Sequence, residues 1–407
     1  QLLKRLDSFV NRSKYKTLGL PETLGLLLYG DPGTGKTIIA IYLMKLIQDI
    51  ANLVDDAVVD EDSIFAEYMT RDNSELLNDY KVGLVIPQQA LRTTLANVFS
   101  KTPGLNKKMI LKPFSVGGSD EKWDLLIVDE AHRLKLRSQY TKGGVNQIKE
   151  IIDSARTSIF FIDEAQKVTW KDIGEIAAIE EFAMNVGAEV EHLELSSQFR
   201  CNGSDDYMAW IDDVLGVRVD DESYFSPEKF DFRVLDSPTE LLNLIKEKNS
   251  VNNRSRVVAG YCWDWVSKKS PSLFDIEFPE FGFKAEWNLE SQGSEWIIQL
   301  DSVNEIGCIH TCQGLELDYV GVIVGPDLVI GGQGLITDPA ARAKTDRSLH
   351  GFKKEMKVDH EKAMKKADEI IRNTYRTLMT RGMKGCFVYF SDPTTAEYFK
   401  TRLSEAL

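Results

Sequence analysis

One short stretch constrains the fold of this chain more than any other. Residues 30–37 read GDPGTGKT and match the pattern G-x-x-x-x-G-K-[ST] in full. An apolar run typical of a buried strand precedes it, and the helix-like sequence TIIAIYLMKLI follows. A phosphate-binding loop requires that context, because its glycines let backbone N–H groups face phosphate oxygens at a helix N-terminus. The stretch therefore predicts a nucleotide-binding α/β domain.

The loop also predicts which residues hold the nucleotide and its metal ion. The residues expected to bind nucleotide are Gly30, Asp31, Pro32, Gly33, Thr34, Gly35, Lys36 and Thr37. Lys36 should reach the β- and γ-phosphates, and the Thr37 hydroxyl should hold Mg²⁺. ATP with Mg²⁺ is therefore the expected cofactor.

Two apolar runs that each end in Asp-Glu-Ala supply candidate acids. Residues 125–135 read LLIVDEAHRLK, and residues 160–169 contain FFIDEAQKVT. Asp129 fits the Walker B acid that completes the metal site, and Glu130 beside it can polarise the attacking water. Both runs satisfy the same local pattern, so the assignment of the metal to Asp163 stays open as an alternative.

The second run has a different expected role. In nucleotide-hydrolysing sheets of this kind, the strand after Walker B lies beside the phosphate-loop strand, so its end points at the γ-phosphate. Gln166 follows that strand, and its amide can both donate and accept a hydrogen bond. We expect Gln166 to sense the γ-phosphate or to orient the water. Near Walker B, His132 is expected to support the acids through a hydrogen bond.

Apolar runs recur between helical stretches along the whole chain, which is typical of parallel α/β sheets. The runs expected to form strands are 24–30, 82–87, 125–129, 158–163, 192–196, 255–261, 306–310, 319–325 and 385–390. Residues 263–304 and 326–346 read as irregular insertions, and the second leads into a Lys-rich helix at 352–372. The pattern restarts after an acidic stretch near residue 218, so we expect two domains, 1–218 and 219–407.

Composition limits the partners of this chain. Its formal net charge of −14 argues against tight non-specific binding of nucleic acid over the whole surface, although it leaves room for a local basic groove. No apolar run approaches the length of a membrane span and no signal peptide is visible, so a cytoplasmic protein is expected. The basic residues of the Lys-rich helix alternate with acids, which favours a solvated face. Trp263 and Trp265 suit base stacking, but packing is the commoner role of such pairs.

The order of further motifs resembles that of a superfamily 1 helicase motor. Residues 195–200, LSSQFR, resemble the fourth motif, whose arginine, here Arg200, reaches the γ-phosphate. Residues 373–385, NTYRTLMTRGMKG, resemble the sixth motif, which implies that Arg381 acts across a cleft between two domains. A cation placed in this way raises the rate of phosphoryl transfer by roughly 10³ to 10⁵. An ordinary salt bridge remains the alternative for Arg200.

Two other motifs of these motors imply contact with nucleic acid. Residues 309–324, IHTCQGLELDYVGVIV, resemble the fifth motif, in which His310 and Thr311 face nucleic acid and Glu316 touches the nucleotide. Residues 85–95, VIPQQALRTTL, resemble motif Ia, a strand end near single-stranded nucleic acid. The candidates for contact with nucleic acid are Gln88, Arg133, His310 and Thr311.

A closer resemblance is to the bacterial helicase-like domain of the Schlafen group 3 type. It is carried by LSSQFRCNGSDDYMAWIDDVL, RVVAGYCWDW, GCIHTCQGLELDYVGVIVGPDL and NTYRTLMTRGMKGC, and it spans residues 24–400. The resemblance implies an α/β fold of two RecA-like parallel-sheet P-loop domains in tandem. It also implies an upstream nuclease or effector domain, which agrees with a chain that begins at Gln1. Because no adenine-reading Gln occurs between residues 2 and 30, ATP is a default choice.

The resemblance implies ATP hydrolysis coupled to binding or movement on DNA or RNA, expected to be single-stranded. The alternative is an ATP-gated switch that acts on a protein partner or an adjoining effector domain without unwinding. A catalytically idle scaffold is the third reading, and the full set of γ-phosphate candidates argues against it.

Overall fold

The computed structural model describes most of the chain, in two compact units. The described residues are 24–29 (backbone), 35–53, 65–117, 121–136, 146–195, 201, 204–218, 225, 228–270, 272–288, 296–297, 299–312, 317–332 and 334–406. Unit 1 comprises residues 1–164 and 172–196, and unit 2 comprises residues 165–171 and 197–407. The short segment 165–171 therefore belongs to unit 2, although both of its flanks belong to unit 1.

Unit 1 is built on a six-stranded parallel sheet in the order β3-β2-β4-β5-β1-β6. Its strands are β1 (Leu24–Tyr29), β2 (Val82–Val85), β3 (Ile110–Leu111), β4 (Trp123–Val128), β5 (Ala155–Ile162) and β6 (Glu189–Glu194). Strand β5 pairs with β4 on one side and with β1 on the other, and Ile162 stands opposite Tyr29. The expectation that the strand after Walker B lies beside the phosphate-loop strand is confirmed.

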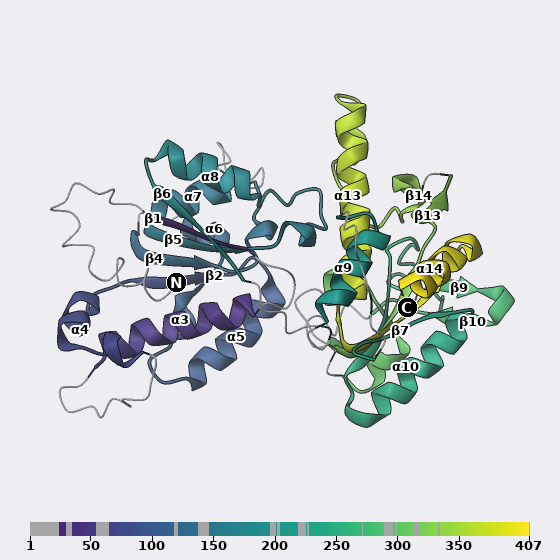
Figure 1. Cartoon of the computed structure of the whole chain (residues 1–407), viewed down its shortest axis with the longest axis horizontal. Helices are drawn as coiled ribbons and strands as arrows, with labels where there is room; N and C mark the ends of the chain where they lie inside the picture. Colours follow the sequence, from purple (N-terminus) through teal and green to yellow (C-terminus); the bar gives the residue numbers. More distant parts are fainter. Residues whose placement is uncertain are drawn as a thin grey trace. The chain divides into compact units, whose positions relative to one another are not determined.

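Helices cover both faces of this sheet because both faces are apolar. Its helices are α3 (Lys36–Ala51), α4 (Arg71–Leu77), α5 (Gln89–Lys101), α6 (Pro113–Val116), α7 (Gln147–Ser154) and α8 (Ile176–Asn185), with 3-10 turns η1 (Ala66–Tyr68), η2 (Lys107–Met109), η3 (Ala131–Arg133) and η4 (Glu164–Gln166), the last of which runs into unit 2. Successive strand residues point to opposite faces. Ile127 therefore joins the core beneath α3 and α5, whereas Val128 joins the core beneath α7 and α8. Figure 1 shows α3 and α5 on one side of this sheet and α7 and α8 on the other. This double covering explains the continuous apolar runs in the sequence.

Unit 2 repeats the plan with a five-stranded parallel sheet in the order β11-β8-β12-β15-β7. Its strands are β7 (Asp231–Leu235), β8 (Ser255–Ala259), β11 (Ile306–Gly307), β12 (Leu317–Val324) and β15 (Gly382–Phe390). Its helices are α9 (Asp205–Val214), α10 (Pro238–Asn252), α11 (Ile309–Cys312), α12 (Phe352–Glu355), α13 (His360–Met379) and α14 (Pro393–Ala406), with η6 (Pro279–Phe281), η8 (Asp301–Asn304) and η9 (Pro339–Ala341). Helix α10 packs on one face, and α9, α13 and α14 pack on the other. The predicted fold class, two RecA-like parallel-sheet domains in tandem, is confirmed.

The two expected insertions of unit 2 each contain an antiparallel hairpin. Strands β9 (Ile276–Phe278) and β10 (Phe283–Ala285) form the first, and β13 (Leu328–Gly331) and β14 (Gly334–Thr337) form the second. Strands of three or four residues carry too little alternation to be recognised from the sequence. The sequence therefore predicted the positions of the two insertions but not the hairpins within them.

Three further expectations differ from the structure. The strand expected at 306–310 ends at Gly307, and α11 begins two residues later. The Lys-rich helix is broken, because the Asp359 side chain accepts a hydrogen bond from the backbone N–H of Lys362 and starts α13 there. Helix α9 falls in the range expected for the first domain, yet it packs in the core of unit 2. The boundary at residue 218 stays a prediction.

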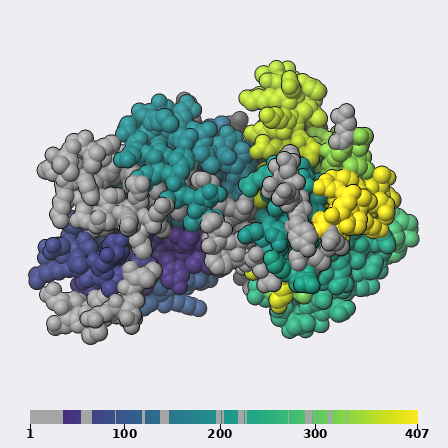
Figure 2. Space-filling view, in the orientation of Figure 1, coloured from purple at the N-terminus to yellow at the C-terminus, as the bar shows by residue number. Residues whose placement is uncertain are grey.

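The first half of α13 stands out from the body of unit 2, and its yellow-green surface is visible in Figure 2. His360, Glu361 and Lys362 are exposed there, which supports the prediction of a solvated face. None of the helices in the described ranges combines the length and the apolar composition that a bilayer span needs.

The buried pair of Asp212 and Arg376 joins α9 to α13, and it gives a prediction about stability. Arg376 is fully buried, and its Nη2 donates to Asp212 Oδ2 at 2.8 Å. Asp212→Ala should lower the free energy of unfolding by about 3–5 kcal/mol, because the arginine charge stays buried without its carboxylate. Denaturant unfolding measures this loss. Asp236→Ala is the matched control, since Asp236 pairs with Lys400 at the surface and should change stability little. Equal effects of the two substitutions would contradict the prediction.

Candidate nucleotide-binding site

The end of the phosphate loop has the backbone that the motif requires. Gly35 adopts φ 74°, in the left-handed region that favours glycine, and α3 begins at the next residue. Lys36 is only 8% exposed at the first position of that helix. The other predicted loop residues, Gly30, Asp31, Pro32, Gly33 and Thr34, lie outside the described residues.

Thr37 and Asp129 meet at this end of the sheet. Asp129 follows β4 and is fully buried, and its Oδ2 accepts a hydrogen bond from Thr37 Oγ1 at 2.6 Å. Burial, and then the neighbouring Glu130 charge, raise the pKa of the Asp129 carboxyl to about 6 despite the Thr37 hydrogen bond. A buried carboxylate beside a hydroxyl suits Mg²⁺. This ion takes few ligands from the protein and the rest from phosphates and water.

The described part of the chain gathers no group of three or more His, Cys, Asp or Glu side chains that could enclose a metal without a nucleotide. The contact between Thr37 and Asp129 favours Asp129 over Asp163 as the metal ligand, although Asp163 is also buried, at the end of β5.

Glu130 has an unusual backbone conformation for its residue type. Its φ is 53°, in the left-handed region, where residues other than glycine are uncommon and often functional. Its Oε2 lies 3.1 Å from His132 Nε2, and the His132 side chain is 1% exposed. Burial favours the neutral acid, but His132, then Arg133 and Lys36, outweigh it and hold the pKa of Glu130 below its usual range. The structure thus places His132 against Glu130.

The turn that carries His132 is fixed by the chain just before α8. The backbone N–H of Ile173 donates to the carbonyl of Leu134 at 2.8 Å. A Cβ atom on Gly174 would lie 2.0 Å from the carbonyl oxygen of Ala131, so only glycine allows this approach. Nothing in the local sequence pattern signalled this support for the Walker B turn.

Glu164 and Gln166, which follow Asp163, differ in their surroundings. Glu164 Oε1 accepts a hydrogen bond from the backbone N–H of Ile176 at 2.9 Å, and so it caps the start of α8. Gln166 is 3% exposed and belongs to unit 2, where its Oε1 accepts from Arg381 Nη2 at 3.1 Å. Arg381 is 1% exposed, and its Nε donates to the carbonyl of Thr377 at 3.2 Å. Two of the predicted γ-phosphate residues are therefore in contact.

Segment 165–171 is anchored in unit 2 by several further contacts. Asn373 Nδ2 donates to the carbonyl of Lys167 at 3.2 Å, and the backbone N–H of Trp170 donates to the carbonyl of Ser348 at 2.6 Å. Val168 is fully buried in the unit 2 core. The position of Gln166 is therefore set by the packing of unit 2.

The candidates for contact with nucleic acid lie in both units. Gln88 is half-buried at the start of α5, and Arg133 is half-buried beside Glu130. His310 is exposed on α11, and Thr311 Oγ1 donates to Asn288 Oδ1 at 2.8 Å. Arg200 and Glu316 lie outside the described residues. The role of each of these residues stays a prediction.

The two tryptophans that were considered for base stacking have partners within unit 2. Trp263 packs edge-on against Phe278 with ring centroids 5.7 Å apart, and its carbonyl accepts from Trp287 Nε1 at 3.1 Å. Trp265 is half-buried, and Lys268 Nζ lies 5.3 Å from its ring centroid. These contacts favour packing.

Comparison with known proteins identifies relatives. Residues 25–392 match the family described as Schlafen group 3, DNA/RNA helicase domain. An uncharacterized protein of Saccharomyces cerevisiae is 25% identical over 98% of this chain and 88% of its own length. The expected resemblance was to a bacterial domain, but a similar sequence also occurs in Saccharomyces cerevisiae.

Among solved structures, the arterivirus helicase nonstructural protein 10 aligns with TM-score 0.37 and 11% identity, over 92% of this chain and 61% of the viral chain. The Pif1 helicase from Bacteroides, solved with ADP-AlF3 and single-stranded DNA, aligns with TM-score 0.34 and 10% identity, over 85% of this chain and 96% of that one. Since both TM-scores lie below 0.5, the fold assignment rests on the sheet topology and on the family match.

Proposed function

Because this chain belongs to the Schlafen group 3, DNA/RNA helicase domain family, we propose that it hydrolyses ATP with Mg²⁺ and couples hydrolysis to binding or movement on single-stranded DNA or RNA. The observation that carries the nucleotide part is the 2.6 Å contact between Thr37 and Asp129 beside the buried Lys36. The family match supports the nucleic-acid part.

The residues of unit 1 would divide the chemistry among themselves. Thr37 and Asp129 would hold the Mg²⁺, which supplies charge neutralisation at the phosphates when bound. Lys36 would bind the β- and γ-phosphates. The Glu130 carboxylate, kept ionised by its surroundings, would accept a hydrogen bond from the attacking water and orient it. Loop residues Gly30, Asp31, Gly33 and Thr34 would supply backbone N–H groups to the phosphates.

A second set of residues, Gln166, Arg200 and Arg381, would act on the γ-phosphate and on its release. We assign Gln166 the role of sensor, and we assign Arg381 and Arg200 the supply of positive charge to the transferring phosphoryl group. The contact between Arg381 and Gln166 supports a joint action of these two residues. Glu316 would touch the nucleotide.

Gln88, Arg133, His310 and Thr311 would contact the nucleic acid. Equilibrium binding tests this partner directly. Fluorescence anisotropy of a labelled single-stranded DNA or RNA oligonucleotide should show binding that weakens as salt rises, because phosphate contacts release counterions. A chain that binds neither oligonucleotide at low salt would refute the nucleic-acid part of the proposal. That result would favour an ATP-gated switch acting on a protein.

A further inference from the structure

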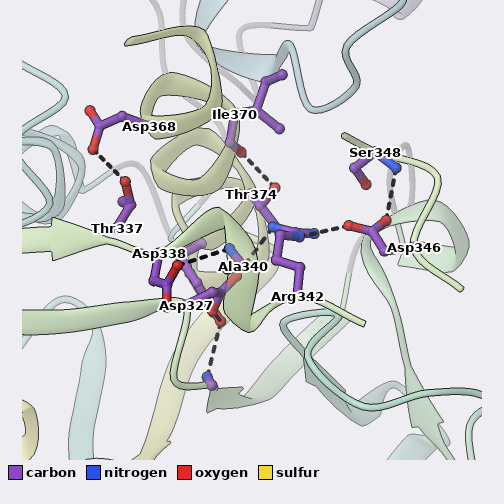
Figure 3. Close-up of polar contacts among 12 residues, drawn as sticks. Asp327, Thr337, Asp338, Ala340, Arg342, Asp346, Ser348, Asp368, Ile370 and Thr374 are labelled. Carbon is purple, nitrogen blue, oxygen red and sulfur yellow. Dashed lines mark hydrogen bonds and ion pairs between the residues drawn. The ribbon is translucent and has the colours of Figure 1, made fainter. Parts of the chain in front are cut away.

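A buried cluster of charges lies in the insertion of unit 2 that carries β13 and β14. Arg342 is 8% exposed, its Nη1 donates to Asp327 Oδ2 at 3.2 Å, and its Nε donates to Asp346 Oδ2 at 2.6 Å (Figure 3). Burial opposes the charge of the arginine, but the two carboxylates outweigh it and raise the pKa of Arg342. Buried ion pairs of this kind often cost as much as they stabilise, so such a cluster suggests a role in specifying geometry.

One end of the cluster is fixed to the central sheet. The hydroxyl of Tyr375, on α13, donates to Asp327 Oδ1 and accepts from the backbone N–H of Gly325 at 3.0 Å, at the end of β12. Asp327 is fully buried. Arg342 is therefore held from a rigid support, and it can set the position of whatever Asp346 contacts.

The other end of the cluster reaches His310. Asp346 Oδ1 accepts from the backbone N–H of Ser348 at 2.8 Å and lies 4.0 Å from His310 Nε2. Ser348 Oγ lies 3.4 Å from the same ring nitrogen. Arg342 thus fixes, through Asp346, the turn that contacts the exposed histidine proposed to face nucleic acid.

The same turn also contacts the segment that carries Gln166. The carbonyl of Ser348 accepts from the backbone N–H of Trp170 at 2.6 Å. Gly351 adopts φ 135°, and a Cβ atom there would lie 2.4 Å from Trp170 Cδ1, so the backbone lies directly against the indole. Trp170 packs edge-on against Phe352, with ring centroids 5.8 Å apart.

We propose that residues 346–351 form a connector between His310 and the Gln166 segment, and that Arg342 is the positioning residue that makes the connector effective. All of these residues belong to unit 2. The inference rests on the proposed function, in which His310 meets nucleic acid and Gln166 senses the γ-phosphate. Its consequence is a coupling free energy: nucleotide changes the affinity for nucleic acid through this turn, and nucleic acid changes the affinity for nucleotide by the same factor.

The insertion has independent anchors, which makes the proposal testable without loss of the fold. Thr337 Oγ1 donates to Asp368 Oδ1 at 2.8 Å, and Arg372 Nη2 donates to the carbonyl of Leu335 at 2.8 Å. Each of these bonds joins β14 to α13, so both can hold the insertion when Arg342 is changed. Thr337→Val is therefore a matched control, because it removes a polar anchor of the same insertion that does not touch the connector.

The test measures the Kd for a labelled single-stranded oligonucleotide with and without a non-hydrolysable ATP analogue and Mg²⁺. The wild-type ratio of the two values should be about 5-fold or more. Arg342→Lys keeps the charge but cannot span both carboxylates, so its ratio should fall to about 1, with basal ATP turnover unchanged. Ser348→Ala, which removes the hydroxyl near His310 alone, should reduce the ratio, and Thr337→Val should leave it at the wild-type value.

Each outcome decides the matter. A wild-type ratio in Arg342→Lys overturns the proposal, as does a wild-type protein whose nucleic-acid affinity ignores nucleotide. If Arg342→Lys does not fold, Ser348→Ala decides, and an unchanged ratio in that variant overturns the connector. A wild-type chain that binds no oligonucleotide removes the proposed function itself and the connector with it, a result that is distinct from the loss of coupling alone.

Discussion

Lys36→Ala should lower kcat for ATP hydrolysis by at least about 10²- to 10³-fold and weaken nucleotide binding. Lys36 is buried at the start of α3, next to the Thr37 and Asp129 pair, so its ammonium group lies where the phosphates are proposed to bind. Alanine removes this positive charge, so the negative charge of the phosphates stays uncompensated in both the ground state and the transition state. Steady-state phosphate release and binding of a fluorescent ATP analogue measure the two effects.

The control for this variant lies on the same helix. Lys45 is partly exposed and pairs with Asp49, which lies one turn further along α3. Lys45→Ala should therefore leave turnover close to that of the wild type. Circular dichroism shows whether both variants remain folded. Turnover at the wild-type rate in Lys36→Ala would remove the assignment of residues 30–37 as the phosphate loop.

Glu130→Gln should bind ATP normally but hydrolyse it slowly, with kcat lower by about 10²- to 10⁴-fold. The amide keeps the shape of the side chain but loses the ionised oxygen that His132, Arg133 and Lys36 stabilise. ATP should therefore stay bound without reacting. Single-turnover experiments with radiolabelled ATP separate the intact binding step from the slow chemical step.

Glu164→Gln is the matched comparison for this prediction. Glu164 Oε1 accepts a hydrogen bond from the backbone of Ile176, and a glutamine oxygen can accept the same bond. Its turnover should stay near the wild-type rate. The opposite pattern, with a slow Glu164→Gln and an active Glu130→Gln, would transfer the role of water activation to Glu164.

The sequence predicted those parts of the molecule that depend on local pattern. The apolar runs that became β4, β5, β8, β12 and β15 are largely buried on both faces of parallel sheets, so each is continuous. The phosphate-loop motif placed Lys36 and Thr37, and the order of motifs placed β5 beside β1. The run at 306–310 misled, because a short apolar run fits a strand and a buried helix equally well.

The contacts that join distant segments were beyond the reach of local pattern. The bond between Arg381 and Gln166 links residues 215 positions apart, and the pair of Arg376 and Asp212 links residues 164 positions apart. Arg342 and its partner Asp327 both lie in an insertion that reads as irregular. Such partners are chosen by tertiary packing, which also moved α9 into the core of unit 2.

The dependence of ATP turnover on nucleic acid tests the central claim most directly. Phosphate release by the purified chain should need Mg²⁺, rise severalfold as single-stranded DNA or RNA is added to saturation, and vanish in Lys36→Ala at every nucleic-acid concentration. A rate that stays flat from zero to saturating DNA and RNA, or a stimulated rate that survives in Lys36→Ala, would contradict the account.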